Sequence, residues 1–206
     1  MEGHSYSSQG QAQHLGTKLN KMLQNVVEMF DDNKLCIYKV PQKFRQSNPE
    51  AYTPGVVSIG PYHKPCDSNG KNKTLKRMEK YKLEYLQKFF ERDPQLNEEE
   101  LFQILIDKEE PIRSSYAEPI NCSNNDFLTM ILVDACFIIE HFLRCCYTGQ
   151  DSTGRDPLLL EKLWMEIDVH SDLTLLENQI PFFVLEEIFN FAAKRGMNLG
   201  VIAMVE

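Results

Sequence analysis

His63, Asp134 and Glu177 are the side chains of this chain whose types and settings could support chemistry. His63 lies in a Gly-Pro-Tyr-His loop, where it could serve as a general base, because loops carry functional residues more often than regular elements do. Asp134 stands within one apolar segment and Glu177 within another. If the fold brings the three together, they define the pocket of an uncharacterised enzyme. A lone loop histidine is more often a surface or packing residue, which favours a chain without catalytic residues.

The spacings that established catalytic and cofactor motifs require do not occur. The sequence has no HExxH, HxH, GxGxxG, Walker A or GxSxG pattern. Its cysteines form no CxxC pair, so a zinc site has no ligand pattern, and reduced, mostly structural thiols are expected. The sequence therefore predicts no enzymatic activity, no cofactor and no metal site.

Three polar residues, Glu177, Asn178 and Gln179, interrupt an apolar run and are followed by Pro181. Proline removes a backbone donor and clashes with the preceding turn, so a helix should break or restart there. The two amide side chains can satisfy the backbone groups that the break frees. We interpret these four residues as a structural motif that holds a kink before the last helix.

A basic segment offers the best candidate for contact with another molecule. Lys73, Lys76, Arg77 and Lys80 follow one another at helical spacing and could touch phosphate, an acidic partner or an anionic membrane surface. An ordinary solvated helix face is the favoured alternative. The formal net charge of −8 argues against general nucleic-acid binding, which requires a basic surface.

Hydrophobic periodicity predicts a mainly α-helical fold, an irregular bundle of about six or seven helices with a small two-strand element. At 206 residues the chain suits one well-buried domain. Residues 1–13 lack periodicity and are expected to be a disordered tail, and residues 14–206 a single helical domain. The predicted helices are 15–30, 74–92, 98–110, 127–146, 158–167 and 181–195; the predicted strands are 36–40 and 55–59; residues 147–156 are expected to be a mobile linker.

The segment 127–146 is nearly as long as the ~20 residues of a transmembrane helix. Asp134 lies near its middle, and a central aspartate costs about 2.5–3.5 kcal/mol on insertion. A buried helix in a soluble bundle explains the segment better. The N-terminus has no secretory signal pattern, so we expect a cytoplasmic location for this chain.

Four segments together resemble one family, the plant DUF247 proteins, also called UPF0481. The resemblance includes the opening Cys-Ile-Tyr-Lys-Val-Pro and Val-Ser-Ile-Gly-Pro-Tyr-His motifs, a basic helix and an apolar central helix. Its most distinctive part is Asp-Leu-Thr-Leu-Leu-Glu-Asn-Gln-Ile-Pro-Phe-Phe-Val-Leu. The first segment comprises residues 36–41, 52–54 and 57–63, and the other three lie at residues 78–86, 126–139 and 172–185.

The resemblance implies more than the residues show. Members of this family usually continue for a couple of hundred residues and end in a membrane-spanning segment, so we expect this chain to be incomplete at its C-terminus. The family has no agreed catalytic residues, and some grass members are implicated in self-incompatibility. We therefore expect a non-enzymatic recognition or signalling module with an unknown protein partner, touching a membrane only through the absent segment. The alternatives are the enzyme considered above and a truncated product without independent function.

Overall fold

The computed structural model describes residues 8–29, 37–64, 73–147 and 163–197, in two compact units, Met1–Leu35 and Cys36–Glu206. In the first unit, helix α1 spans Ser8–Met29. Residues 8–13, which the sequence assigns to a tail, are therefore helical. The apolar side chains that gave α1 its predicted amphipathic pattern are exposed, at Leu15, Leu19, Met22 and Leu23.

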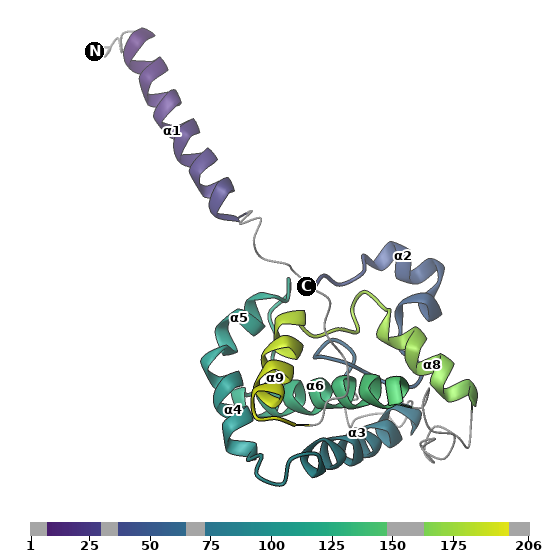
Figure 1. Ribbon diagram of the computed structural model, residues 1–206. Helices are drawn as coiled ribbons and strands as arrows, with labels where there is room; N and C mark the ends of the chain where they lie inside the picture. The colour runs from purple at the N-terminus through teal and green to yellow at the C-terminus, as the bar shows by residue number, and fades with distance from the viewer. Residues whose placement is uncertain (1–7, 30–36, 65–72, 148–162, 198–206) are drawn as a thin grey trace. The chain divides into compact units, whose positions relative to one another are not determined.

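In the second unit, helix α6 (Asn124–Tyr147) forms the centre of the core (Figure 1). Helices α3 (Lys73–Glu91), α4 (Glu98–Asp107) and α9 (Phe182–Lys194) pack against it. The side chains that α6 contributes are apolar on nearly every side, which is typical of a helix surrounded by protein. Those fully buried include Phe127, Ile131, Ala135, Cys136 and Leu143.

The helix ends follow from local chemistry. Asn97 caps α4 and forms a capping box with Glu100, so it satisfies backbone donors that the first turn leaves open. Pro181 precedes α9, and the chain turns at Gly196 with a φ of 78°. The short helix α5 (Glu109–Ser114) contains Pro111 in its first turn, where a missing N–H costs nothing.

The described residues contain eight α-helices, more than the six or seven expected. The mainly helical class is confirmed, and the additional helices are short ones whose few residues give no clear periodicity. They include α2 (Gln42–Ser47), which is followed by a 3-10 turn, η1 (Pro49–Tyr52), and α5. Helix α8 (Leu163–Leu173) extends beyond the predicted end at residue 167, and the predicted linker lies mostly outside the described residues.

The predicted two-strand element is wrong for the part of the chain that the structure describes. Ile37 forms an isolated parallel bridge with Tyr116, and Ile37 N–H donates to Ser115 O at 2.5 Å. Residues 55–59 form no strand: the chain bends at Gly55 and Val56, and the N–H groups of residues 55, 56, 57 and 59 donate to side chains rather than to a neighbouring strand. The described helices also include none that is long and apolar enough to cross a membrane.

Candidate functional site

A mostly buried segment without regular secondary structure, residues 55–60, is called the strap below. Val56, Val57 and Ile59 are buried, so their N–H groups have no access to bulk water. A buried N–H that lacks a partner is costly, and a strap without a neighbouring strand must find its partners elsewhere. The strap obtains them from three polar side chains that arrive from helices α6 and α8 and from the turn before α9.

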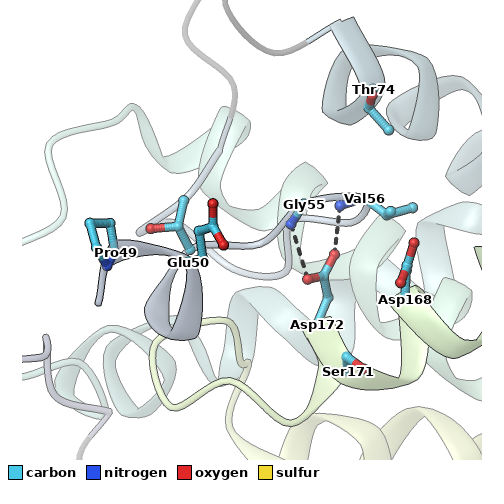
Figure 2. A pocket seen from close by; sticks show the side chains of 9 residues that line it. Pro49, Glu50, Gly55, Val56, Thr74, Asp168, Ser171 and Asp172 are labelled. Atoms are coloured by element: carbon cyan, nitrogen blue, oxygen red, sulfur yellow. Dashed lines mark hydrogen bonds between the residues drawn. The ribbon is translucent and has the colours of Figure 1, made fainter. Parts of the chain in front are cut away.

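Asp172, in the last turn of α8, binds the first half of the strap. Its carboxylate accepts hydrogen bonds from the N–H groups of Gly55 at 3.0 Å, Val56 at 2.7 Å and Val57 at 2.8 Å. Figure 2 shows the bonds to Gly55 and Val56. A carboxylate can accept several bonds at once, which is what three consecutive donors require.

Asn178 binds the middle of the strap and uses both ends of its amide. Its Oδ1 accepts from Ile59 N–H at 2.7 Å, and its Nδ2 donates to Val57 O at 2.9 Å and to Asp172 O at 2.9 Å. The last bond satisfies a carbonyl at the end of α8. The amide thus satisfies a backbone group at the helix break, as the sequence predicts for Asn178. It also binds the strap, which lies more than a hundred residues away in the sequence.

Asp134 binds the end of the strap. Its Oδ2 accepts from Gly60 N–H at 2.8 Å, and its Oδ1 accepts from Lys82 Nζ at 2.7 Å. Lys82 also donates to Ser58 O and pairs with Glu79 at 2.5 Å. Burial raises the pKa of Asp134; burial acts against the charge of Lys82, but the two carboxylates overcome it and raise its pKa.

Gly60 makes the turn at the end of the strap possible. Its φ of 70° lies in the left-handed region, and an added Cβ would collide with Gln179 O. Tyr116 donates its hydroxyl to the same carbonyl at 3.2 Å. Gln179 therefore contributes through its backbone.

Glu177 joins the segment before α2 to the loop that follows the strap. Its carboxylate accepts from Val40 N–H and from Arg45, and His63 Nε2 lies 3.1 Å from its Oε2. Glu177 is 3% exposed and His63 is 12% exposed. Burial, with Arg45 nearby, lowers the pKa of His63, although Glu177 acts in the opposite direction.

The structure brings His63 and Glu177 together, while Asp134 bonds to Gly60 and Lys82. Both carboxylates are buried and hydrogen-bonded to backbone donors, so they secure the chain. A pocket of about 690 Å³ opens at the other end of the strap (Figure 2). None of these three residues lines it; its lining is Pro49, Glu50, Thr53, Gly55, Val56, Thr74, Asp168, Ser171 and Asp172.

The predicted basic residues lie on one side of α3, and we call them the basic stripe. Lys73, Arg77 and Lys80 are exposed and Lys76 is half-buried. Arg77 donates to Tyr81 Oη at 3.1 and 2.7 Å. Residues three and four apart share a helix face, so the four charges form a continuous row. The opposite face is buried through Leu75, Met78, Lys82, Tyr85 and Phe89.

Sequence inspection missed the bonding roles of Asp172 and Lys82. Lys82 occupies a position of the apolar face of α3, where a charge must find a partner to be buried. The position of Lys82 on the apolar face could therefore have indicated a buried ion pair from the sequence. Asp172 offered a weaker signal, since it ends a helix directly before the polar triplet.

The family model DUF247, described as plant protein of unknown function, matches residues 37–205. The UPF0481 protein At3g47200 of Arabidopsis thaliana is 36% identical over 166 residues, 80% of this chain and 33% of its own length. The putative UPF0481 protein At3g02645 of the same plant is 32% identical over 163 residues, 76% of this chain and 27% of its own.

The fold and the strap define a mainly helical protein whose buried polar side chains bind backbone. The chain belongs to the DUF247, or UPF0481, family of plant proteins of unknown function. It spans about a third of the length of the curated relatives it matches. No solved structure matches it.

Proposed function

We propose that this chain is a non-enzymatic recognition module that binds an acidic surface of a protein partner through the basic stripe on α3. The observation that carries the proposal is the division of polar residues. Two buried carboxylates and one buried amide bind the strap, whereas Lys73, Arg77 and Lys80 remain on the surface.

The use of the buried groups supports a role without catalysis. A general base or nucleophile must present an open lone pair to a substrate. Asp172 already accepts three backbone bonds, Asn178 takes part in three, and Glu177 accepts from Val40 and Arg45. Releasing any of them would leave a buried N–H without a partner, which opposes a catalytic cycle.

The surroundings of the basic stripe support an acidic protein partner. Rim charges steer association and set specificity more than they add affinity. The whole chain is acidic, with a net charge of −8, so a row of positive charges stands out from its surface. A partner with a matching acidic row gains the attraction locally while the rest of the surface repels other acidic molecules.

Affinity capture from plant tissue tests the proposal with a charge-reversal variant. The variant carries Lys73→Glu, Arg77→Glu and Lys80→Glu, and the matched control carries Lys43→Glu, Lys64→Glu and Lys194→Glu, which are also exposed. Both changes alter the net charge equally. We expect the wild-type chain and the control variant to capture a specific partner and the stripe variant to capture none. The complex with the wild-type chain should dissociate faster at higher salt, because salt screens exposed charges.

If the stripe variant and the control variant capture the partner equally, the assignment of the surface is contradicted. If folded wild-type protein captures no specific partner, the recognition role itself is contradicted.

In the same proposal the chain acts in the cytoplasm. A fluorescent fusion in plant cells checks that part independently.

The contact of His63 with Glu177 favours a second candidate, an enzyme that uses the histidine as a base. Incubating the chain with a plant metabolite extract and comparing products by mass spectrometry tests this alternative. A product formed by the wild-type chain and not by His63→Gln would replace the recognition proposal.

A further inference from the structure

Three side chains that bind transition metals meet between α6 and α8. His141 and Cys145 are four residues apart on α6 and therefore share a face of that helix. His170 reaches them from α8. Cys145 Sγ lies 3.9 Å from His141 Nε2 and 4.0 Å from His170 Nε2, and one ligand atom from each residue falls within 4.8 Å of the others.

These separations are close to those of a tetrahedral metal site. Zinc binds thiolate at about 2.3 Å and imidazole at about 2.0–2.1 Å, which places the sulfur and each nitrogen roughly 3.5 Å apart. The observed separations exceed this value by about half an ångström. Small rotations of the side chains therefore suffice to close the three ligands around an ion.

The setting of the three residues combines a fixed base with an accessible side. The His141 ring is fully buried and stacks on Phe137 with ring centroids 5.8 Å apart and 12° between the planes. Cys145 is half-buried and His170 is exposed. A buried ring has few rotamers to lose on binding, and the exposed histidine leaves a route for the ion and room for a fourth ligand from solvent.

The charges beside the site do not oppose a cation strongly. Arg144 is the nearest basic neighbour in sequence, and its guanidinium pairs with Glu140 at 2.8 Å and lies over the Tyr85 ring at 4.6 Å. Its charge is therefore compensated. Imidazole and thiolate together suit a borderline-soft divalent ion such as zinc, and three protein ligands leave its fourth tetrahedral position open.

We infer that His141, Cys145 and His170 form a zinc site that joins α6 to α8. This site is independent of the proposed recognition surface. Because α8 also carries Asp172, the bound ion would hold in place the helix that secures the strap. The sequence predicts no metal site, because the three ligands do not form a known metal-binding motif. They are a His-x-x-x-Cys pair within an apolar helix and a histidine on another helix.

Titration of the purified metal-free chain with Co²⁺ tests the site, because cobalt reports its ligands spectroscopically. We expect one equivalent to bind and to produce a near-ultraviolet thiolate-to-cobalt charge-transfer band, and Zn²⁺ to displace it. Cys145→Ser should abolish the band, and His170→Ala should weaken binding about 100-fold or more, since loss of an outer partner alone costs about 10–100-fold.

The controls are Cys122→Ser and His14→Ala, which change an exposed cysteine and an exposed histidine that are not among the three ligands. Both should bind cobalt as the wild-type chain does. His170 is exposed, so its removal should leave the circular dichroism of the apo chain unchanged. Absence of a thiolate band in the wild-type chain, or an unchanged titration of Cys145→Ser and His170→Ala, would overturn the assignment.

Discussion

Replacing Asn178 by leucine tests whether side chains, and not packing alone, hold the strap. Leucine has the same branching and the same number of side-chain heavy atoms as asparagine, with bulkier methyl groups and no polar atoms. The change removes three bonds and leaves Ile59 N–H, Val57 O and Asp172 O without this partner in a site where Asn178 is 1% exposed.

The magnitude follows from these three groups. A buried polar group that loses its partner costs about 1–3 kcal/mol, with carbonyls at the low end because their second lone pair tolerates poorer satisfaction. We therefore expect Asn178→Leu to lower the free energy of unfolding by about 3–5 kcal/mol. Asn190→Leu is the matched control, since Asn190 is exposed on α9 and its replacement should stay within about 0.5 kcal/mol.

Urea unfolding followed by circular dichroism measures the difference, and hydrogen exchange locates it. The Ile59 amide should be protected in the wild-type chain and in Asn190→Leu, and should exchange faster in Asn178→Leu. If Asn178→Leu unfolds at the same urea concentration as the control, and Ile59 stays protected, the strap does not depend on this amide and the reasoning fails.

Three further predictions concern the same network. Gly60→Ala should cost at least about 2 kcal/mol in urea unfolding, because of its positive φ and the collision with Gln179 O; wild-type stability would refute this. Lys82→Met should cost about 3–5 kcal/mol by stranding the Asp134 charge, and adding Asp134→Asn should restore part of the loss, whereas purely additive costs would contradict the pairing. Burial lowers the pKa of His63 in the folded chain, so the unfolded chain takes up the proton first. The stability that the folded chain gains from keeping His63 neutral is fully present above about pH 6.5, the usual pKa of histidine, and is lost as the pH falls toward the folded pKa. Wild-type stability should therefore decrease more than that of His63→Gln between about pH 7.5 and 5.5; parallel pH profiles would refute it.

The main helices could be predicted because their signals are local. The apolar spacing of α3 and the caps Asn97 and Gly196 depend on residues within a few turns of each other. Such signals place elements without information about the rest of the chain. They fail for α2 and α5, which are too short to show a period.

The partners of the strap could not be predicted by the same means. Its β-branched residues indicate extended backbone, but they do not say which groups satisfy its donors. Those groups lie far along the sequence: 117 residues separate Gly55 from Asp172, and 74 separate Gly60 from Asp134. Within the candidate site, Glu177, Asn178 and Gln179 could be singled out because they are polar residues within an apolar run. The role of the basic stripe stays a prediction.

The distance between the strap and Asp172 also bears on the order in which the chain can fold during synthesis. At about 5–20 residues per second, the ribosome needs roughly 6–23 s to make the 117 residues from Gly55 to Asp172. Throughout that interval Val56 and Val57 have neither the carboxylate nor the amide that later binds them. A nascent chain released before residue 172 would expose an extended, apolar segment with open N–H groups, which is the kind of segment that pairs with other chains. The strap thus stays unsecured until residues 172–178 have been made, and chaperone protection of the nascent chain would matter during that interval.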